Sequence, residues 1–214
     1  MSIENLLKKR KQNKNYDQQN YPSLEDVKKL IDKTFNLTAS KQNLYPYKVH
    51  ILGPNHQNIK RDFFDIVCLQ SGGAGNTNIL SAPYCLIFTT RLVRNPDSKI
   101  LARIKKGHAY SVCDPKSYNN MQAGISIEVG MFSKVLTSLC LEKNIDVSYT
   151  LCFPPYDNNK KEVWKKLSFI EDPVLFSMQL GYRTGLINYN KEKKPNIDEV
   201  INWLKHWLFI NNLI

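Results

Sequence analysis

The sequence predicts a globular fold of the α/β or α+β class, in which helices and strands alternate around one sheet. Segments with helical spacing of apolar residues alternate with short apolar segments that are typical of strands. The 214 residues are 42% hydrophobic and 23% charged, which is ordinary for a folded protein and excludes intrinsic disorder. No internal repeat or shift in composition marks a boundary, so a single domain is predicted over 1–214.

In the first half of the chain, the predicted order is helix, helix, strand, helix, strand. The second helix begins after Ser23, whose side chain can cap its first turn, with Asp26 reaching back. The last strand is a continuous apolar run from Tyr84, which is typical of a strand buried on both faces. The expected segments are 2–7, 24–35, 47–52, 62–69 and 84–89.

The second half opens with residues 91–120, which are irregular and basic, and no element is predicted there. The strongest helical pattern follows, because Ile125, Val129, Phe132 and Leu136 recur on one stripe. Its length and apolar width predict a central core helix. The expected segments are a helix at 124–141, a strand at 146–153, a helix at 163–167, a strand at 174–182 and a helix at 197–210.

The chain is strongly basic, with 30 Lys and Arg against 19 Asp and Glu, for a formal net charge of +11. Only 6 of the 30 cations are Arg, whereas surfaces that read bases favour the bidentate fork of Arg. The cations are spread along the chain, and the aromatic residues fall within apolar patterns. The charge therefore predicts attraction to an anion, and a nucleic-acid-binding module ranks lowest among the functions considered.

The five cysteines are odd in number and scattered without a C-x-x-C pair, which argues against a disulfide framework or a zinc site. Cys85 and Cys140 lie within apolar patterns and are expected to be inert core thiols. The first residues lack an apolar segment of signal-peptide length, and no run of 18 apolar residues predicts a membrane span. A reducing, cytoplasmic setting is the simplest expectation.

Motifs for covalent or metal chemistry are absent from the sequence. There is no Walker A motif and no Gly-x-Ser-x-Gly elbow, and the four histidines have no partner at metal-ligand spacing. The loop from Gly73 begins like G-x-G-x-x-G but lacks the last glycine, so a dinucleotide fingerprint is disfavoured. No side chain is therefore predicted to act as a catalytic acid, base, nucleophile or metal ligand.

Four segments follow one another in order and together span nearly the whole chain. They are a basic segment ending in an aromatic residue (10–16), a Ser-x-x-Asn-x-x-Pro-aromatic turn (40–47), a long helix leading into a strand (128–152), and a Gly-Tyr strand end followed by a basic loop (181–195). In this order they resemble the nitroreductase family of FMN-dependent NAD(P)H oxidoreductases. The chain departs from the family at Gln12 (Ser in the family), at Lys14 and Lys193 (Arg) and at Tyr47 (Trp). A lysine neutralises a phosphate but cannot grip it bidentately, so these changes could weaken FMN binding.

The resemblance implies an α+β fold of the nitroreductase type, which is a three-layer sandwich with a central mixed sheet flanked by helices. It further implies an intertwined homodimer with FMN at its interface. Hydride equivalents would pass from NADH or NADPH to an oxidised acceptor (a nitroaromatic, quinone or related compound) by a ping-pong mechanism. The apolar C-terminal segment, about 196–214, would dock on the partner subunit, and packing on its own chain is the alternative.

The resemblance also implies which residues hold FMN. The phosphate would meet cations from both ends of the chain, with Gln12 as a neutral donor. The turn at 40–43 would reach the flavin from the partner subunit, Asn78 or its neighbour Asn76 would face the polar edge of the ring, and the main-chain N–H of Leu151 would donate to flavin N5. The residues expected at the site are Arg10, Lys11, Gln12, Lys14, Ser40, Lys41, Asn43, Asn78, Tyr149, Thr150, Leu151, Cys152, Lys191 and Lys193.

Two other functional classes stay open on the sequence alone. One is a flavin-binding carrier or sensor without turnover, and the less favoured one is a basic nucleic-acid-associated module. Flavin colour that bleaches on adding NAD(P)H would indicate the enzyme, whereas colour without bleaching would indicate the carrier.

Overall fold

A computed structural model describes residues 4, 5, 8, 10, 13–71, 78–151, 153, 154 and 161–185. By its contacts the chain divides into a compact unit, Met1–Thr184, and a second unit, Gly185–Ile214, of which only Gly185 is described. The helix expected at 197–210 and the docking of 196–214 on a partner lie outside the described residues. They stay predictions, as does the single domain over the whole chain.

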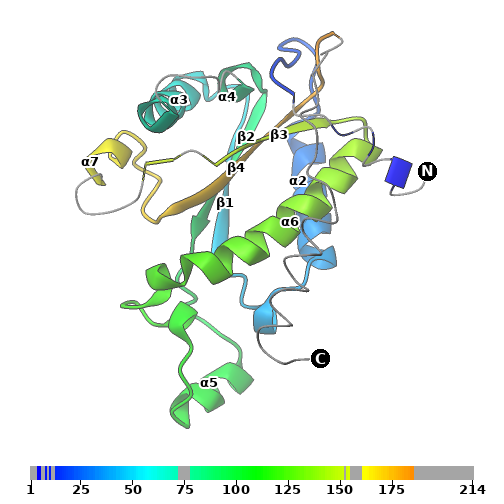
Figure 1. Cartoon of the computed structure of the whole chain (residues 1–214). Coiled ribbons are helices and arrows are strands. Elements are labelled where there is room, and N and C mark those ends of the chain that lie inside the picture. Colours follow the sequence, from blue (N-terminus) through cyan, green and yellow to red (C-terminus); the bar gives the residue numbers. More distant parts are fainter. Residues whose placement is uncertain are drawn as a thin grey trace, which may run out of the picture. The chain divides into compact units, whose positions relative to one another are not determined.

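The first unit is built on a four-stranded sheet with the order β1-β2-β4-β3 (Figure 1). The strands are β1 (Tyr47–Leu52), β2 (Tyr84–Thr90), β3 (Asp146–Thr150) and β4 (Val174–Gly181). All three pairings among these strands are antiparallel, so the mixed sheet expected from the resemblance is not found in the described residues. β2 and β3 run parallel, but β4 lies between them and prevents a parallel pair.

Helices cover both faces of this sheet. The alternating side chains of β2 explain why, because Leu86 and Phe88 pack in one core cluster while Cys85 and Ile87 pack in the other. The first cluster joins the sheet to α2 (Leu24–Leu37) and α6 (Gln122–Glu142). The second joins it to α3 (Gln57–Ser71) and α7 (Lys161–Trp164), with α4 (Asn78–Ser81) on the same side (Figure 1). Every residue of β2 is buried, as its continuous apolar sequence predicts.

The two long helices confirm their sequence signals. Ser23 caps α2, since its Oγ accepts from the main-chain N–H of Asp26 at 3.1 Å and donates to the Asp26 carboxylate at 2.6 Å. The predicted core helix is α6, which is long and apolar enough to cross a membrane by length and composition alone. Half of it is buried in the protein, where Phe132 and Leu136 have no exposed surface, so it packs as a core helix.

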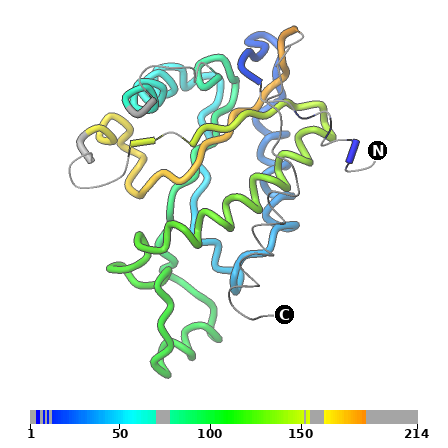
Figure 2. Tube along the Cα trace, viewed as in Figure 1, coloured from blue at the N-terminus to red at the C-terminus, as the bar shows by residue number. Residues whose placement is uncertain are grey.

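Residues 91–121 differ most from the sequence prediction. They leave the end of the sheet as a long excursion, drawn in green in Figure 2, and they contain a helix, α5 (Ser98–Lys105). Asp97 caps α5 by accepting from the main-chain N–H of Ile100 at 2.8 Å. Only Ile100 of this helix is buried, so the sequence carries no broad apolar stripe that would have predicted it.

Three predicted boundaries also need correction. The helix expected at 62–69 begins earlier, at Gln57, and β3 ends at Thr150 rather than at 153. The early start of α3 brings Lys60 into the core, where its Nζ donates to the main-chain oxygens of Ala82 (2.8 Å) and Pro83 (3.1 Å). Lys60 is fully buried, but a lysine in a sequence is expected at the surface. The sequence pattern therefore did not predict the first turn of α3. The short helix α7 ends at Trp164.

Candidate functional site

The residues before α2 form an ordered strap along one end of the sheet. The main-chain N–H of Asp17 donates to the oxygen of Tyr182 at 2.8 Å, and that of Thr184 donates to the oxygen of Asn15 at 3.3 Å. Ser81, at the end of α4, donates from its Oγ to the main-chain oxygen of Lys14 at 2.9 Å. Residues 13–17 therefore lie against the end of β4 and against α4 (Figure 1). We call them the 13–17 segment.

Tyr16 anchors the 13–17 segment in the core. Its hydroxyl lies 2.8 Å from Ser148 Oγ of β3 and donates to the main-chain oxygen of Gln179 at 3.1 Å. Burial raises the pKa of the Tyr16 hydroxyl far above its ordinary value, so it stays a neutral hydrogen-bonding group. Gly181 makes room for the ring, because a Cβ there would lie 2.6 Å from Pro83 Cδ and 2.9 Å from Tyr16 Cδ1. The Gly-Tyr signal at the end of the strand thus has a steric cause.

Asn78 joins α4 to the sheet through a buried polar network. Its Nδ2 donates to Ser148 Oγ and to Gln179 Oε1, both at 2.9 Å, and Thr150 Oγ1 donates to the same Gln179 oxygen at 3.4 Å. Both amide hydrogens of Asn78 are thereby used within the protein. The expectation that Asn78 faces the polar edge of a flavin now depends on its Oδ1 alone. Its neighbour Asn76 lies outside the described residues.

Arg10 and Asn13 carry buried polar atoms that the described residues leave without hydrogen-bond partners. The guanidinium carbon of Arg10 lies 5.6 Å from the ring centroid of Tyr149, a cation–π contact, while Arg10 Nη1 has no partner. Asn13 is only 2% exposed, yet both Nδ2 and Oδ1 lack a partner. Each such group costs about 1–3 kcal/mol when left unpaired. Unsatisfied buried groups in a basic segment indicate a place where a polar ligand binds.

Several residues expected at the site from the resemblance lie on neighbouring elements. Arg10 lies over the Tyr149 ring, and Ser81 of α4 donates to the Lys14 main chain. Asn78 and Thr150 share Gln179 Oε1, on the face of β3 opposite to Tyr149. Leu151 directly follows β3 and is 69% exposed, at the end of a strand that forms one edge of the described sheet. Asn13 was missed by sequence reasoning, because an asparagine within a basic segment carries no signal of burial. Lys11, Gln12, Cys152, Lys191 and Lys193 lie outside the described residues.

Ser40, Lys41 and Asn43 lie elsewhere, in a strained turn at 40–45. Gln42, Asn43 and Tyr45 all have left-handed backbone conformations, with φ of 59°, 56° and 44°. Residues other than glycine rarely adopt such conformations unless surrounding contacts impose them. The strain was not visible in the sequence, which contains no glycine here.

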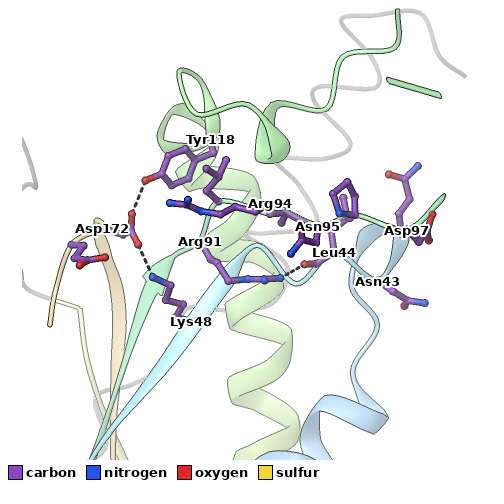
Figure 3. A pocket seen from close by; sticks show the side chains of 14 residues that line it. Asn43, Leu44, Lys48, Arg91, Arg94, Asn95, Asp97, Tyr118 and Asp172 are labelled. Atoms are coloured by element: carbon purple, nitrogen blue, oxygen red, sulfur yellow. Dashed lines mark hydrogen bonds and ion pairs between the residues drawn. The ribbon is translucent and has the colours of Figure 1, made fainter. Parts of the chain in front are cut away.

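Two charged side chains hold the 40–45 turn in place. Glu128 of α6 accepts from Ser40 Oγ at 2.6 Å and from the main-chain N–H of Lys41 at 3.2 Å. On the other side, Arg91 donates from Nε to the main-chain oxygen of Tyr45 at 3.0 Å and from Nη2 to that of Leu44 at 2.5 Å (Figure 3). Neither Arg91 nor Glu128 was expected at the site, and only the tertiary structure brings them together.

The 40–45 turn and the contact between Arg10 and Tyr149 lie at different positions along α6. Glu128 holds the turn, whereas Thr137 of the same helix forms a hydrogen bond with the Tyr149 hydroxyl beside Arg10. Nine residues of α-helix place these two contacts about 14 Å apart along the helix axis. Within one chain, the structure therefore gathers the expected site residues into two groups rather than one.

Two cavities flank the 40–45 turn, and the 91–121 excursion lines both. One, of about 810 Å³, contains Lys48 and Tyr118, which both bind Asp172: Lys48 Nζ is 3.3 Å from Oδ2, and the Tyr118 hydroxyl donates to Oδ1 at 2.6 Å (Figure 3). The other, of about 510 Å³, lies between the turn, residues 103–112 and the first part of α6.

The cysteines and acidic residues offer no other reactive centre in the part of the chain that the structure describes. No group of three or more His, Cys, Asp or Glu there could hold a metal ion. Cys85 and Cys140 are fully buried, and burial raises the pKa of both thiols, that of Cys85 to about 12. They are inert core thiols, as expected.

Solved structures with this fold are numerous, although no family sequence model and no curated protein sequence matches the chain. A protein of Staphylococcus epidermidis named as an NAD(P)H:FMN oxidoreductase superposes with a TM-score of 0.70 at 14% identity, covering 93% of this chain and 94% of its own. A nitroreductase-like protein of Streptococcus mutans gives a TM-score of 0.65 at 14% identity, covering 91% and 94%.

A protein of Exiguobacterium sibiricum named as a nitroreductase, solved in complex with FMN, gives a TM-score of 0.63 at 13% identity and covers 94% of this chain and 96% of its own. At such low identity the similarity establishes the fold alone. The chain has the α+β fold of nitroreductase family proteins.

Proposed function

We propose that this protein is an FMN-dependent oxidoreductase of the nitroreductase type, which passes electrons from NADH or NADPH to an oxidised acceptor. The observation that carries the proposal is that Arg10 and Asn13, in one basic segment, have buried polar atoms without partners among the described residues, and that Arg10 lies over the Tyr149 ring. A fold shared with an FMN complex makes FMN the first ligand to consider for these atoms.

The residues present suit the phosphate of FMN. Arg10 and Lys14 supply positive charge, and the amide of Asn13 supplies a donor that has no partner among the described residues. A charge-assisted hydrogen bond to phosphate contributes about 1.5–3 kcal/mol. Lys191 and Lys193, outside the described residues, are proposed to complete the phosphate site, with Lys11 and Gln12.

The end of β3 suits the flat ring. β3 is an edge strand of the described sheet, with β4 as its one neighbouring strand there. We place the ring along Tyr149, Thr150 and Leu151, with the Leu151 N–H toward flavin N5. The buried network of Tyr16, Ser148 and Asn78 holds this strand rigidly against α4.

A homodimer explains why the site residues fall into two groups. The 40–45 turn lies about 14 Å along α6 from the contact between Arg10 and Tyr149, so we propose that each turn serves the flavin of the partner subunit. α6 offers a surface for a second copy, because Ile127 and Met131 are 67% and 45% exposed beside the solvent-facing Gly124. Large exposed apolar residues together on one helix favour association.

FMN, when bound, would accept a hydride from NAD(P)H and pass the electrons to a nitroaromatic, quinone or related acceptor in a ping-pong sequence. The protein's own residues then bind and orient. Arg10 and Lys14 fix the phosphate, the end of β3 fixes the ring, and the 40–45 turn limits access to it. Because FMN would supply the redox chemistry and the protein would bind and orient it, the protein needs no catalytic acid or base.

The purified protein tests this proposal directly. We expect it to bind FMN and to lose the flavin absorbance on anaerobic addition of NADH or NADPH, with the absorbance restored by a nitroaromatic or quinone. Arg10→Ala should weaken FMN binding by about 10- to 100-fold. Lys28→Ala removes an exposed charge on α2 and is the control, since it should leave FMN affinity unchanged.

A protein that binds no added FMN would refute the proposal. A protein that binds FMN but never bleaches with either nucleotide would be a flavin carrier. Equal losses of affinity in Arg10→Ala and Lys28→Ala would show that bulk charge, and not Arg10 itself, attracts the cofactor.

A further inference from the structure

The smaller of the two cavities beside the 40–45 turn has the size and lining of a ligand site. Its volume of about 510 Å³ lies within the usual range of about 300–1,000 Å³ for small-molecule pockets. Apolar residues, including Pro46, Val112, Met121 and Ile125, form much of its wall. This lining suits a flat apolar ring.

The charged groups of this cavity are mostly cationic. Lys41 and Arg103 line it, and neither forms an ion pair with another described residue. The one acidic residue in the lining is Glu128, and both of its oxygens already accept hydrogen bonds from Ser40 and Lys41. An anionic group on a ligand would therefore meet unpaired positive charge, and chiefly the Arg103 guanidinium, which can bind a carboxylate or phosphate bidentately.

Gln42 adds an acceptor, Oε1, that has no hydrogen-bond donor among the described residues. Its Nε2 donates to the Tyr110 hydroxyl at 3.1 Å, but its Oε1 is buried without a hydrogen-bond donor among the described residues. The left-handed backbone of Gln42, with φ of 59°, places this side chain in the cavity wall. A ligand that carries both an anionic group and a hydrogen-bond donor would satisfy Gln42 and Arg103 together.

We propose that this cavity binds a flat, ring-bearing substrate through an anionic substituent held by Arg103, with Lys41 adding charge. The proposal rests on the proposed function, because it takes the 40–45 turn to lie beside the flavin. The anionic group could belong to the acceptor, as a carboxylate, or to the reductant, as the 2′-phosphate that distinguishes NADPH from NADH. Both share one chemistry, and the experiment separates them.

The first arm compares 4-nitrobenzoate with 4-nitrobenzamide, which have similar shape but differ in charge, at fixed NADH. Each turnover converts NADH, H⁺ and the nitro compound to NAD⁺, the nitroso compound and water, a two-electron reduction. Arg103→Gln should lower the ratio of kcat/KM for the benzoate over the benzamide by about tenfold, through KM, because it removes one charge-assisted contact. Lys105→Gln, on the same helix but outside the cavity lining, should leave this ratio unchanged.

The second arm compares NADPH with NADH at a fixed, neutral acceptor in the same variants. A fall confined to the first arm assigns the anionic group to the acceptor, and a fall confined to the second assigns it to the reductant. If Arg103→Gln changes neither ratio, or if Lys105→Gln changes them equally, the anion site is refuted even though turnover of the neutral acceptor is normal.

A binding measurement distinguishes failure of the anion site from failure of the proposed FMN-dependent activity. Calorimetric titration with 4-nitrobenzoate needs no turnover, so it applies even to a protein that fails to reduce any acceptor. Binding to the wild type that weakens about tenfold in Arg103→Gln but not in Lys105→Gln would support the anion site. Binding of 4-nitrobenzoate that is absent, or equal in all three proteins, would overturn the acceptor assignment. The same result for NADP⁺ compared with NAD⁺ would overturn the anion site as a whole, whatever the flavin assays show.

Discussion

The 13–17 segment and the 40–45 turn differ in backbone conformation and in how their polar groups are paired. The 13–17 segment has no left-handed residue, but Asn13 and nearby Arg10 keep buried polar atoms without partners. The 40–45 turn has three left-handed residues, yet its main chain is held by Glu128 and Arg91. A relaxed backbone with unsatisfied side chains is poised to be completed by a ligand. A strained main chain whose polar groups are held by neighbouring side chains keeps its shape without a ligand, although the Gln42 side chain there also has an Oε1 without a partner among the described residues.

The largest expected effect comes from the packing beneath the 13–17 segment. Gly181→Ala should lower the free energy of unfolding by about 3 kcal/mol, because the new methyl group would overlap the rigid ring of Pro83 and displace Tyr16. FMN affinity should fall with it, as the segment shifts. Urea unfolding and fluorescence titration with FMN measure the two effects.

Gly53→Ala is the matched control for this substitution. A Cβ at Gly53 would meet only ordinary contacts, 3.6 Å from Tyr84 Cε1 and 3.8 Å from His56 Nδ1. Its cost should stay within about 0.5 kcal/mol. Equal losses from the two substitutions would show that the close contact of Gly181 does not position the segment.

A pH-dependent effect is expected from Lys60, which supports Pro83 under the same segment. Burial lowers the pKa of Lys60 from 10.5 to about 8, so the folded state binds fewer protons than the unfolded state between these values. The contribution of Lys60 to stability therefore rises as the pH increases from 8 to 10.5, and it is lost over the same range as the pH falls, with no further change below pH 8. The gain is about 3 kcal/mol.

Lys60→Met isolates this contribution, because other groups that titrate in the range cancel in the comparison. We expect wild-type stability to increase relative to Lys60→Met across pH 8–10.5, as measured by urea unfolding at several pH values. A constant difference between the two proteins would mean that the Lys60 pKa is not lowered in the fold.

The stability of the 40–45 turn should depend on the Glu128 carboxylate. Glu128→Ala removes the acceptor of Ser40 Oγ and the Lys41 N–H, and we expect it to cost about 2 kcal/mol of unfolding free energy. Glu128→Gln should recover part of this loss, because its amide oxygen can still accept. Glu142→Ala, at the exposed end of α6, is the control and should cost little. If Glu128→Ala is as stable as the wild type, the turn does not need this carboxylate.

The smallest expected effect is that of Asn13→Leu. It should change the stability of the FMN-free protein and the FMN affinity in opposite directions, so it tests the difference between the two segments most directly. Asn13→Leu should stabilise the FMN-free protein by about 1 kcal/mol, since it replaces a buried amide without partners by an apolar group of similar size. The same change should weaken FMN binding. Thermal unfolding with and without FMN measures both, and a destabilised FMN-free protein would show that Asn13 already has its partners.

Much of the fold follows from local patterns that a sequence displays. The capping of α2 by Ser23 and the burial of β2 were predicted, and α6 was recognised as the core helix, because each depends on residues close together in the chain. The order of the four similar segments also predicted the nitroreductase fold, which the solved structures share.

The arrangement of the strands and the details of the site were decided by contacts between distant residues. β4 inserts between β2 and β3, and no local pattern in either strand announces that position. Arg91 reaches the carbonyl groups of a turn 46 residues earlier in the chain, and Glu128 reaches Ser40 across 88 residues. The same side chains would read as ordinary surface charges in the sequence, so their roles were not predicted.

The sequence by itself determined most of the described helices and strands, though not α5, and its resemblance to a family named the basic candidates for a phosphate. The tertiary structure decided that Asn13 is buried without partners among the described residues, that Gly181 must lack a side chain, and that the turn at 40–45 lies apart from Tyr149 along α6. The physical reason is that secondary structure and burial follow from short-range periodicity. The satisfaction of a buried polar atom depends on every neighbour that the fold places around it.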